Sequence, residues 1–343
     1  MHRPVSLLTT CVAALVAAAP AAAQAPVPPP PPGTTPAPAP APSPAPAPAP
    51  APAAGALSIK LERVNGKAAA VLAGTRFRVR GTVKPYVAGQ RVTVRVYRGE
   101  RKVAARRVTV APVKGGARGT LVHDFEFRLP GHLTVRASHR ATAQQATMVA
   151  RGRGLDVLPL RARPGTTGLA VRLLQQRLAR LGYVVGRRGV FDGRTARAVL
   201  AFRKVTGMAR TIEASEEVFR RLARGQGAFK VRYPGHGKHV EADLSRQVLV
   251  FARGAKVERI YHISSGAPGT PTILGSFRVY MKTPGTNAKG MVFSSYFIRG
   301  YAIHGYASVP VFNASHGCLR VPVPDAVSIY NWVQMGDRVD VYP

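Results

Sequence analysis

The sequence of 343 residues has few acidic residues, few cysteines and no long apolar run. Asp and Glu together number 15 against 50 Lys and Arg, which gives a formal charge of +35 at pH 7. The two cysteines, Cys11 and Cys318, exclude a scaffold held together by several disulfides. No apolar run reaches the roughly 18 residues that a membrane-spanning helix requires. Apolar residues still make up 46% of the chain, which is enough for packed cores. At roughly 100–200 residues per domain, the length predicts two or three domains.

Residues 1–23 have the pattern of a secretory signal peptide. Residues 1–3 are a short basic start, residues 5–19 are mostly apolar, and residues 21–23 are the small residues of a cleavage site. We therefore expect an exported protein, located in the cell wall or the periplasmic space, whose mature form retains one cysteine. A lipoprotein signal is disfavoured because Cys11 lies inside the apolar run.

The positive charge is dispersed along the chain, in pairs such as Arg106-Arg107 and Arg187-Arg188, without a dense basic block. Nucleic acid is therefore not the expected partner of this exported chain. Carboxylates and phosphates of the cell envelope would be attracted by the same long-range field, so we expect anionic cell-wall polymers as partners.

Residues 24–54 form a Pro/Ala-rich linker, because 15 of the 30 prolines lie between Pro26 and Pro52. Proline fixes φ and lacks an amide hydrogen, so the segment should be extended polyproline II, with a span on the order of 80–90 Å.

Residues 55–152 then alternate apolar and polar side chains, as in runs 77–80 and 92–96. About seven short strands predict an antiparallel β-sandwich that resembles immunoglobulin-like modules and serves as a spacer or adhesion module.

Residues 156–224 change to helical periodicity. Leu169, Leu173, Leu174, Leu178 and Leu181 share one face, and two further helices follow. This predicted three-helix bundle resembles the peptidoglycan-binding domain of wall hydrolases and transpeptidases. The residues that carry the resemblance are Val171, Leu174-Gln175, Leu178, Leu181-Gly182-Tyr183, Gly189-Val190-Phe191, Thr195, Ala198-Val199 and Ala201-Phe202. The chain departs from the pattern at Arg203, where Gln is common, and at Arg210-Thr211-Ile212-Glu213, which replaces a Gly-rich turn.

Residues 229–343 return to strand patterns and contain Cys318. A free thiol is mostly protonated at pH 7, so nucleophilic use of this residue needs a base. His304 and His316 are the candidates, and His316 would share a face with Cys318 if the segment were extended. The amides of Gly317 and Cys318 could form an oxyanion hole, and Arg320 adds positive charge that favours thiolate or binds a carboxylate. One Cys and two His without a nearby acidic residue make a weak zinc set, so no metal is expected.

Ser315-His316-Gly317-Cys318, with His304-Gly305 upstream, resembles the signature of the L,D-transpeptidase catalytic domain, the YkuD family. The resemblance spans about residues 236–343, so we expect a mainly β catalytic domain within 229–343. It also includes Asp243-Leu244-Ser245-Arg246-Gln247, Ser264-Ser265-Gly266, Thr270-Pro271, Gly275-Ser276-Phe277-Arg278-Val279 and Gly336-Asp337-Arg338-Val339. Thr272-Ile273-Leu274 make the following loop longer than the shortest form in the family.

The resemblance implies the roles of the residues. His304 is the general base, oriented by the carbonyl of Gly305, and Cys318 attacks the third residue of a peptidoglycan stem peptide. Terminal D-Ala leaves, and an amine of a second stem resolves the thioester into a cross-link. His316 and Ser315 then shape the pocket, and Arg320 contacts substrate. The substrates supply both reacting groups, so no cofactor is implied.

Two other functions stay open on the sequence alone. Water could resolve the thioester, which would make the protein an L,D-carboxypeptidase or endopeptidase, or the domain could be a non-catalytic wall-binding module. The order of His304 and Cys318 disfavours papain-like wall peptidases, where Cys comes first. Their separation of 14 residues disfavours sortases, where His lies much farther upstream.

Overall fold

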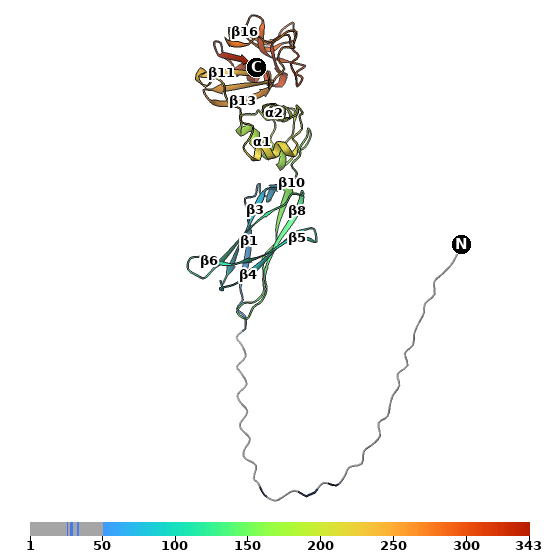
Figure 1. Ribbon diagram of the computed structural model, residues 1–343, viewed down its shortest axis with the longest axis vertical. Helices are drawn as coiled ribbons and strands as arrows, with labels where there is room; N and C mark the ends of the chain where they lie inside the picture. The colour runs from blue at the N-terminus through green and yellow to red at the C-terminus, as the bar shows by residue number, and fades with distance from the viewer. Residues whose placement is uncertain (1–25, 27, 30–32, 34–50) are drawn as a thin grey trace, which may run out of the picture. The chain divides into compact units, whose positions relative to one another are not determined.

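The computed structural model describes residues 51–343 and, upstream of them, Pro26, Pro28, Pro29 and Gly33 (Figure 1). The expected signal peptide and most of the Pro/Ala-rich linker therefore lie outside the described residues. The chain divides into the units Met1–Pro50 and Ala51–Pro343, and the second is mostly β with four α-helices. None of the described helices is both long and apolar enough to cross a membrane.

Two sheets make up residues 56–158. Their strands are β1 (Ala56–Glu62), β2 (Ala70–Leu72), β3 (Arg76–Lys84), β4 (Arg91–Arg98), β5 (Arg101–Thr109), β6 (Ala111–Pro112), β7 (Gly119–Glu126), β8 (Gly131–His139), β9 (Met148–Val149) and β10 (Arg153–Leu158). The first sheet has the order β1–β3–β7–β6 and is antiparallel. The second has the order β2–β10–β8–β4–β5, with β9 beside β8, and its β2–β10 pair is parallel.

The buried side chains of both sheets meet in one hydrophobic core. Along β4, Val92, Val94 and Val96 are fully buried while the residues between them are partly exposed. Phe77 and Val79 of β3 alternate in the same way. Full burial of such a side chain contributes about 1.5–3 kcal/mol. The period of two in the sequence therefore produces two layers around one core.

The strand pattern was predictable, but the end of this segment was not. Seven of the strands have six residues or more, and the other three, β2, β6 and β9, have two or three. β10 lies beyond the expected boundary at residue 152. Leu155 and Val157 continue the alternation there and pack into the same core.

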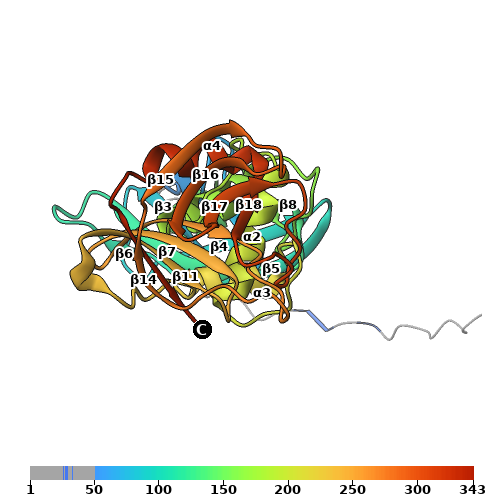
Figure 2. The same cartoon turned by 90° about the horizontal axis from the view of Figure 1, so that it is seen from above.

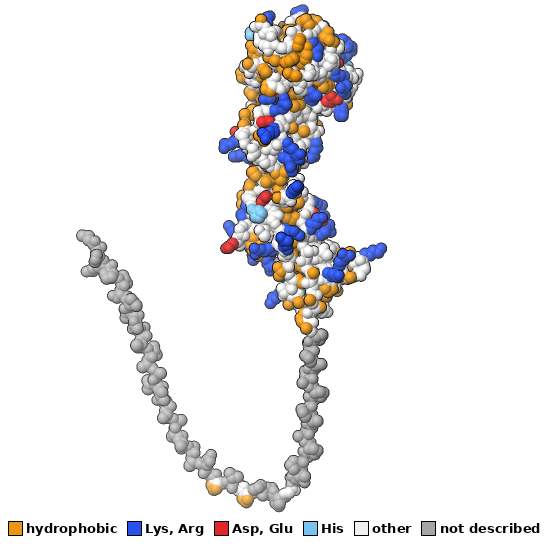
Figure 3. Space-filling view, turned by 180° about the vertical axis from the view of Figure 1, so that it is seen from behind, with side chains coloured by type: hydrophobic (Ala, Val, Ile, Leu, Met, Phe, Trp, Pro, Cys, Tyr) orange, Lys and Arg blue, Asp and Glu red, His pale blue; other side chains and the backbone are white. Residues whose placement is uncertain are grey.

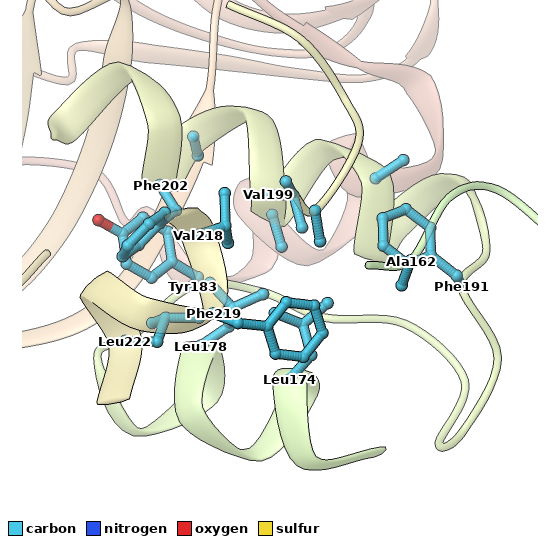
Figure 4. Packing of buried hydrophobic residues seen from close by; sticks show 14 of the residues in the cluster. Ala162, Leu174, Leu178, Tyr183, Phe191, Val199, Phe202, Val218, Phe219 and Leu222 are labelled. Carbon is cyan, nitrogen blue, oxygen red and sulfur yellow. The ribbon is translucent and has the colours of Figure 1, made fainter. Parts of the chain in front are cut away.

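Three helices, α1 (Leu169–Arg180), α2 (Gly193–Val205) and α3 (Glu216–Ala223), share a second hydrophobic core (Figure 4). Leu174 and Leu178 of α1 are fully buried there, with Phe202 of α2, as the helical periodicity predicted. The carboxylate of Asp192 accepts a hydrogen bond from the Thr195 amide at 2.8 Å and caps the start of α2.

The two departures from the peptidoglycan-binding pattern contact each other. Arg203 is 7% exposed and donates to the carbonyls of Ala209 and Glu213 at 3.0 Å each. A third bond reaches Ser215 Oγ at 3.2 Å. The Arg203 side chain therefore closes the turn between α2 and α3, where the family's Gly-rich turn would rely on backbone freedom.

The last part of the chain contains two further sheets and one α-helix. Their elements are the 3₁₀-helix η1 (Pro234–His236), β11 (Lys238–Asp243), β12 (Val248–Arg253), β13 (Lys256–His262), β14 (Gly275–Arg278), β15 (Met281–Thr286), β16 (Val292–Ile298), β17 (Tyr301–Tyr306), β18 (Leu319–Pro322), α4 (Val323–Trp332) and β19 (Arg338–Tyr342). One sheet has the order β13–β12–β11–β19–β14, and the other has the order β15–β16–β17–β18.

These two sheets and α4 share a third core. Val240 and Leu249 come from the five-stranded sheet, Ile303 and Leu319 from the four-stranded sheet, and Ile329 from α4. Figure 2 shows β16, β17 and β18 side by side, with α4 next to them. β17 and β18 are parallel neighbours, and this pairing brings the two halves of the sequence motif together.

Candidate active site

Cys318 lies at the end of a bend that leads into β18. Residues 316–318 form the bend, and regular strand structure starts at Leu319. The thiol is partly buried, and Sγ donates to the Gly300 carbonyl at 3.7 Å. The backbone of Ala302 is also near enough to the sulfur to lower the pKa of Cys318. The sulfur is therefore held against the backbone at the start of β17.

His304 lies in the middle of β17, beside the strand that follows Cys318. The register of β17 and β18 pairs His304 with Arg320, two residues after Cys318. The imidazole is 3% exposed, and Nδ1 lies 2.9 Å from the Gly305 carbonyl oxygen. Because a carbonyl oxygen only accepts, the neutral ring carries its hydrogen on Nδ1 and has a lone pair at Nε2.

Gly305 allows β17 to approach α4 closely. A Cβ atom at this position would lie 2.7 Å from the Cβ of Ala326 in α4 and 3.1 Å from the Cβ of Val292 in β16. Any side chain would push these elements apart. The glycine therefore fixes the strand that carries His304, in addition to providing the carbonyl that orients the ring.

Burial shifts the pKa of both candidate reactive groups towards the neutral form. It lowers the pKa of His304 and raises the pKa of Cys318. The backbone of Ala302 and the positive charges of Arg320 and Lys289 act to lower the pKa of Cys318, but burial is the larger effect. The resting pair is consequently a thiol and a neutral imidazole rather than an ion pair.

The bend before β18 is built by Ser315 and Gly317. Ser315 is 1% exposed, and its Oγ donates to the Cys318 carbonyl at 2.6 Å and accepts from the Gly317 amide at 3.1 Å. Gly317 has φ of 107°, and a Cβ atom there would overlap the ring of Tyr301. Only glycine meets both conditions.

Two possibilities that the sequence left open depend on this bend. The chain is not extended between His316 and Cys318, so the condition under which their side chains would share a face is not met. The Gly317 amide is bonded to Ser315 Oγ, so it is not a free donor for an oxyanion. The Cys318 amide is the other donor that the sequence proposed.

Residues 264–272 support the bend. Ser264 exchanges two backbone hydrogen bonds with Arg320, at 3.0 and 3.1 Å. Thr272 Oγ1 donates to the Gly317 carbonyl at 2.8 Å, and Thr270 Oγ1 donates to the Ser315 carbonyl at 2.9 Å. The family resemblance had included Ser264 and Thr270 without a role, and these bonds give them one.

Arg320 is held beside the pair formed by His304 and Cys318. Its guanidinium carbon lies 4.2 Å from the centre of the Tyr306 ring, and one nitrogen donates to the Ala314 carbonyl at 3.2 Å. The structure thus brings together six of the seven predicted residues and leaves His316 exposed at the surface. The six are Cys318, His304, Gly305, Ser315, Gly317 and Arg320.

Two residues near the thiol were missed from the sequence. Tyr301 covers Gly317, and the exposed Lys289 lowers the pKa of Cys318 through its charge. Strand alternation could have placed Tyr301 on one face of β17, but no local pattern marks Lys289. A thiol that directly precedes β18 and an imidazole with a lone pair at Nε2 on the neighbouring strand β17 are the components of nucleophilic acyl transfer.

Family models match both folded segments after the first two sheets. Residues 237–341 match the L,D-transpeptidase catalytic domain, YkuD, and residues 167–222 match a putative peptidoglycan binding domain. The catalytic segment of this chain belongs to the L,D-transpeptidase family, and the two matched domains imply peptidoglycan as the substrate.

Solved structures of the same family resemble this chain. An L,D-transpeptidase from Xylanimonas cellulosilytica DSM 15894 is 34% identical over 54% of this chain and 98% of that chain, with a TM-score of 0.49. The catalytic domain of an E. faecium L,D-transpeptidase is 26% identical over 31% of this chain and 98% of that chain, with a TM-score of 0.27. No curated protein sequence matches this chain.

Proposed function

We propose that this protein is an exported L,D-transpeptidase that cross-links peptidoglycan stem peptides through a thioester on Cys318. The observation that supports the proposal is the state of His304, whose Nδ1 hydrogen is directed to the Gly305 carbonyl. Its Nε2 lone pair is therefore available on the strand beside Cys318, without any acidic third residue. A base of this kind can take a thiol proton during attack.

Acylation starts from the neutral pair. His304 Nε2 accepts the Cys318 proton as sulfur bonds to the carbonyl carbon of the third stem residue. The negative charge on the carbonyl oxygen is stabilised by the Cys318 amide, because the Gly317 amide is already bonded to Ser315. When the intermediate collapses, the carbon–nitrogen bond breaks, D-Ala leaves with the proton from His304, and a thioester remains.

Transfer of the acyl group reverses these roles. An amine of a second stem peptide attacks the thioester, and His304 takes a proton from the attacking nitrogen. The carbon–sulfur bond then breaks, the thiol is regenerated, and an amide joins the third residues of two stems. Arg320 and the pocket around Ser315 orient the donor stem, and the exposed His316 lines its approach.

The remaining segments have roles that would bring the catalytic segment to the cell wall. Residues 1–23 export the chain and residues 24–54 separate the folded part from the membrane. The segment 55–158, extended from the predicted boundary, is an immunoglobulin-like spacer. The three helices bind peptidoglycan. Lys and Arg side chains are spread over the visible surface, with few Asp and Glu (Figure 3), which suits anionic wall polymers.

Mass spectrometry of products from residues 24–343 incubated with disaccharide-tetrapeptide tests the proposal. A dimer linked through two third residues is expected from the wild-type protein and should be absent from Cys318→Ala. Cys318-dependent tripeptide without dimer would instead assign hydrolysis, as in a carboxypeptidase or endopeptidase. Unchanged substrate would identify a non-catalytic wall-binding protein.

A further inference from the structure

The turn between α2 and α3 is bonded to the loop that precedes the thiol. Arg210, in this turn, donates to the Val311 carbonyl and to the Ser245 carbonyl at 2.9 Å each. Val311 belongs to residues 307–317, the connection between β17 and Cys318. Arg203 shapes the same turn through its bonds to Ala209 and Glu213. Of the two arginines that depart from the family pattern, Arg210 thus links the helical segment to residues 307–317, and Arg203 holds the turn that carries Arg210.

A second link between the helical and the catalytic segments is buried. Lys204, near the end of α2, is 4% exposed, and its Nζ lies 3.0 Å from each of three acceptors. These are the carbonyls of Gln247 and Ile263 and the Nδ1 atom of His262. In its ammonium form, which predominates below about pH 7, the side chain has one hydrogen for each of the three acceptors. Burial lowers the pKa of Lys204 to about 7 and that of His262 to about 3, so the imidazole stays neutral and accepts.

One of the groups that Lys204 bonds, the Ile263 carbonyl, is adjacent in sequence to Ser264, which supports the bend at Cys318. Ile263 precedes Ser264, whose backbone pairs with Arg320. Ser264 Oγ also donates to the Phe312 carbonyl at 2.7 Å and accepts from the Ala314 amide at 3.1 Å. The connection 307–317 is therefore attached to the helical segment directly, through Arg210, and indirectly, through Lys204.

We propose that Arg210 and Lys204 are positioning residues for Cys318, so that the helical segment is part of the catalytic unit as well as a wall-binding module. They act by fixing the connection 307–317 and the segment 263–264 that supports it. Neither residue contacts the sulfur. The inference rests on the proposed function for its turnover readout, but its thiol-reactivity readout is independent of that function.

The test uses Arg210→Met in the chain 24–343, because this change removes the donors while retaining an aliphatic stem. Arg210→Lys restores one donor. Arg101→Met is the matched control, since Arg101 is exposed in β5, outside the helical and catalytic segments, and makes no side-chain hydrogen bond among the described residues. Each variant is measured for Tm, for kcat and KM with disaccharide-tetrapeptide, and for the rate of Cys318 alkylation by iodoacetamide.

Arg210→Met should lower kcat about tenfold, with less change in KM and Tm, because the sulfur is displaced from its attack position. Its thiol should be alkylated about threefold faster at pH 7, because loosening the connection exposes it. Arg210→Lys should recover part of kcat, and Arg101→Met should equal wild type. The proposal is overturned if Arg210→Met leaves both kcat and the alkylation rate unchanged, or if Arg101→Met changes them equally.

The two proposals fail in different ways. If the wild-type protein turns over no tetrapeptide, the proposed function fails, and the alkylation rates still decide whether Arg210 positions the thiol. Lys204→Met provides a second measurement, in which faster alkylation in a protein that remains folded supports the inference. An unchanged alkylation rate in folded Lys204→Met contradicts the role of Lys204.

Discussion

Cys318 and His304 illustrate how one physical cause can act on two residues in opposite directions. Removal from water disfavours charge, so burial raises the pKa of the thiol and lowers the pKa of the imidazole. The charge of Arg320, next to both groups, opposes the first shift and reinforces the second. The sequence identified both residues, but it could not give their resting state, because burial depends on how β17 and the bend pack.

The neutral pair predicts a characteristic pH dependence. Because burial raises the pKa of Cys318 above that of an ordinary thiol, its alkylation by iodoacetamide should keep accelerating at a pH where an ordinary thiol is already fully ionised. Because burial lowers the pKa of His304, this residue should remain a neutral base, and kcat/KM should be maintained, to a lower pH than an ordinary imidazole would allow. Rates measured across the pH range by intact-mass spectrometry, with Cys318→Ala as the unmodified control, check this. A flat alkylation rate between about pH 5 and 7 would show a preformed thiolate instead.

At the scale of elements, local patterns predicted what local physics decides. Leu174 and Leu178 recur at helical spacing and are buried, and Val92 and Val94 alternate and are buried. The bend at Gly317 was not predicted, because its left-handed φ depends on hydrogen bonds from Ser315 and on the ring of Tyr301. Backbone bends of this kind are set by contacts with other segments of the chain, which local sequence patterns do not show.

The support of the bend by residues 264–272 was also invisible in the sequence. Thr272 lies 45 residues before Gly317, and its Oγ1 bonds the Gly317 carbonyl and the Gly266 amide. A pairing over such a distance leaves no periodic signal. The resemblance to the YkuD family predicted which segments belong to the domain, and the structure adds how they touch.

Thr272→Val tests this support, because valine has a similar shape but cannot donate to Gly317 or accept from Gly266. Two buried groups would lose their partner, which we expect to cost about 2–6 kcal/mol of unfolding free energy, at about 1–3 kcal/mol per unpaired group. Chemical denaturation measures the loss, and the same variant should show lower kcat. Thr109→Val, on an exposed strand position, is the control. Equal stability of the two variants would contradict the assigned role of Thr272.

At the scale of the whole unit Ala51–Pro343, the helical and catalytic segments share both apolar and charged contacts. Val248, Val250 and Ile260, from β12 and β13, pack into the core of the three helices. The expected boundary at residue 229 therefore lies between the two segments that match family models, but the hydrophobic core of the helical segment includes residues from both sides of it. Sequence patterns could not reveal this, because burial of β12 on both faces looks the same whichever segment covers it.

Asp325 of α4 provides the charged part of this interface. Its side chain is 3% exposed and lies 2.8 Å from Arg194 Nε and 3.0 Å from Arg197 Nε, both in α2. A buried carboxylate with two guanidinium partners is costly to break, because the charges left behind remain partly desolvated.

Asp325→Asn keeps the shape of the side chain and removes its charge. The arginines are 37% and 24% exposed and so keep some hydration, which reduces the expected loss to about 1–3 kcal/mol of unfolding free energy. Glu217→Gln is the matched control, because its pair with Arg221 is an exposed pair within α3, and water screens such a pair, so a much smaller loss of stability is expected. Urea denaturation of both variants measures the difference. If Asp325→Asn costs no more than Glu217→Gln, the segments are held by apolar contacts alone, and the charged contacts of α2 with the catalytic segment serve position rather than stability.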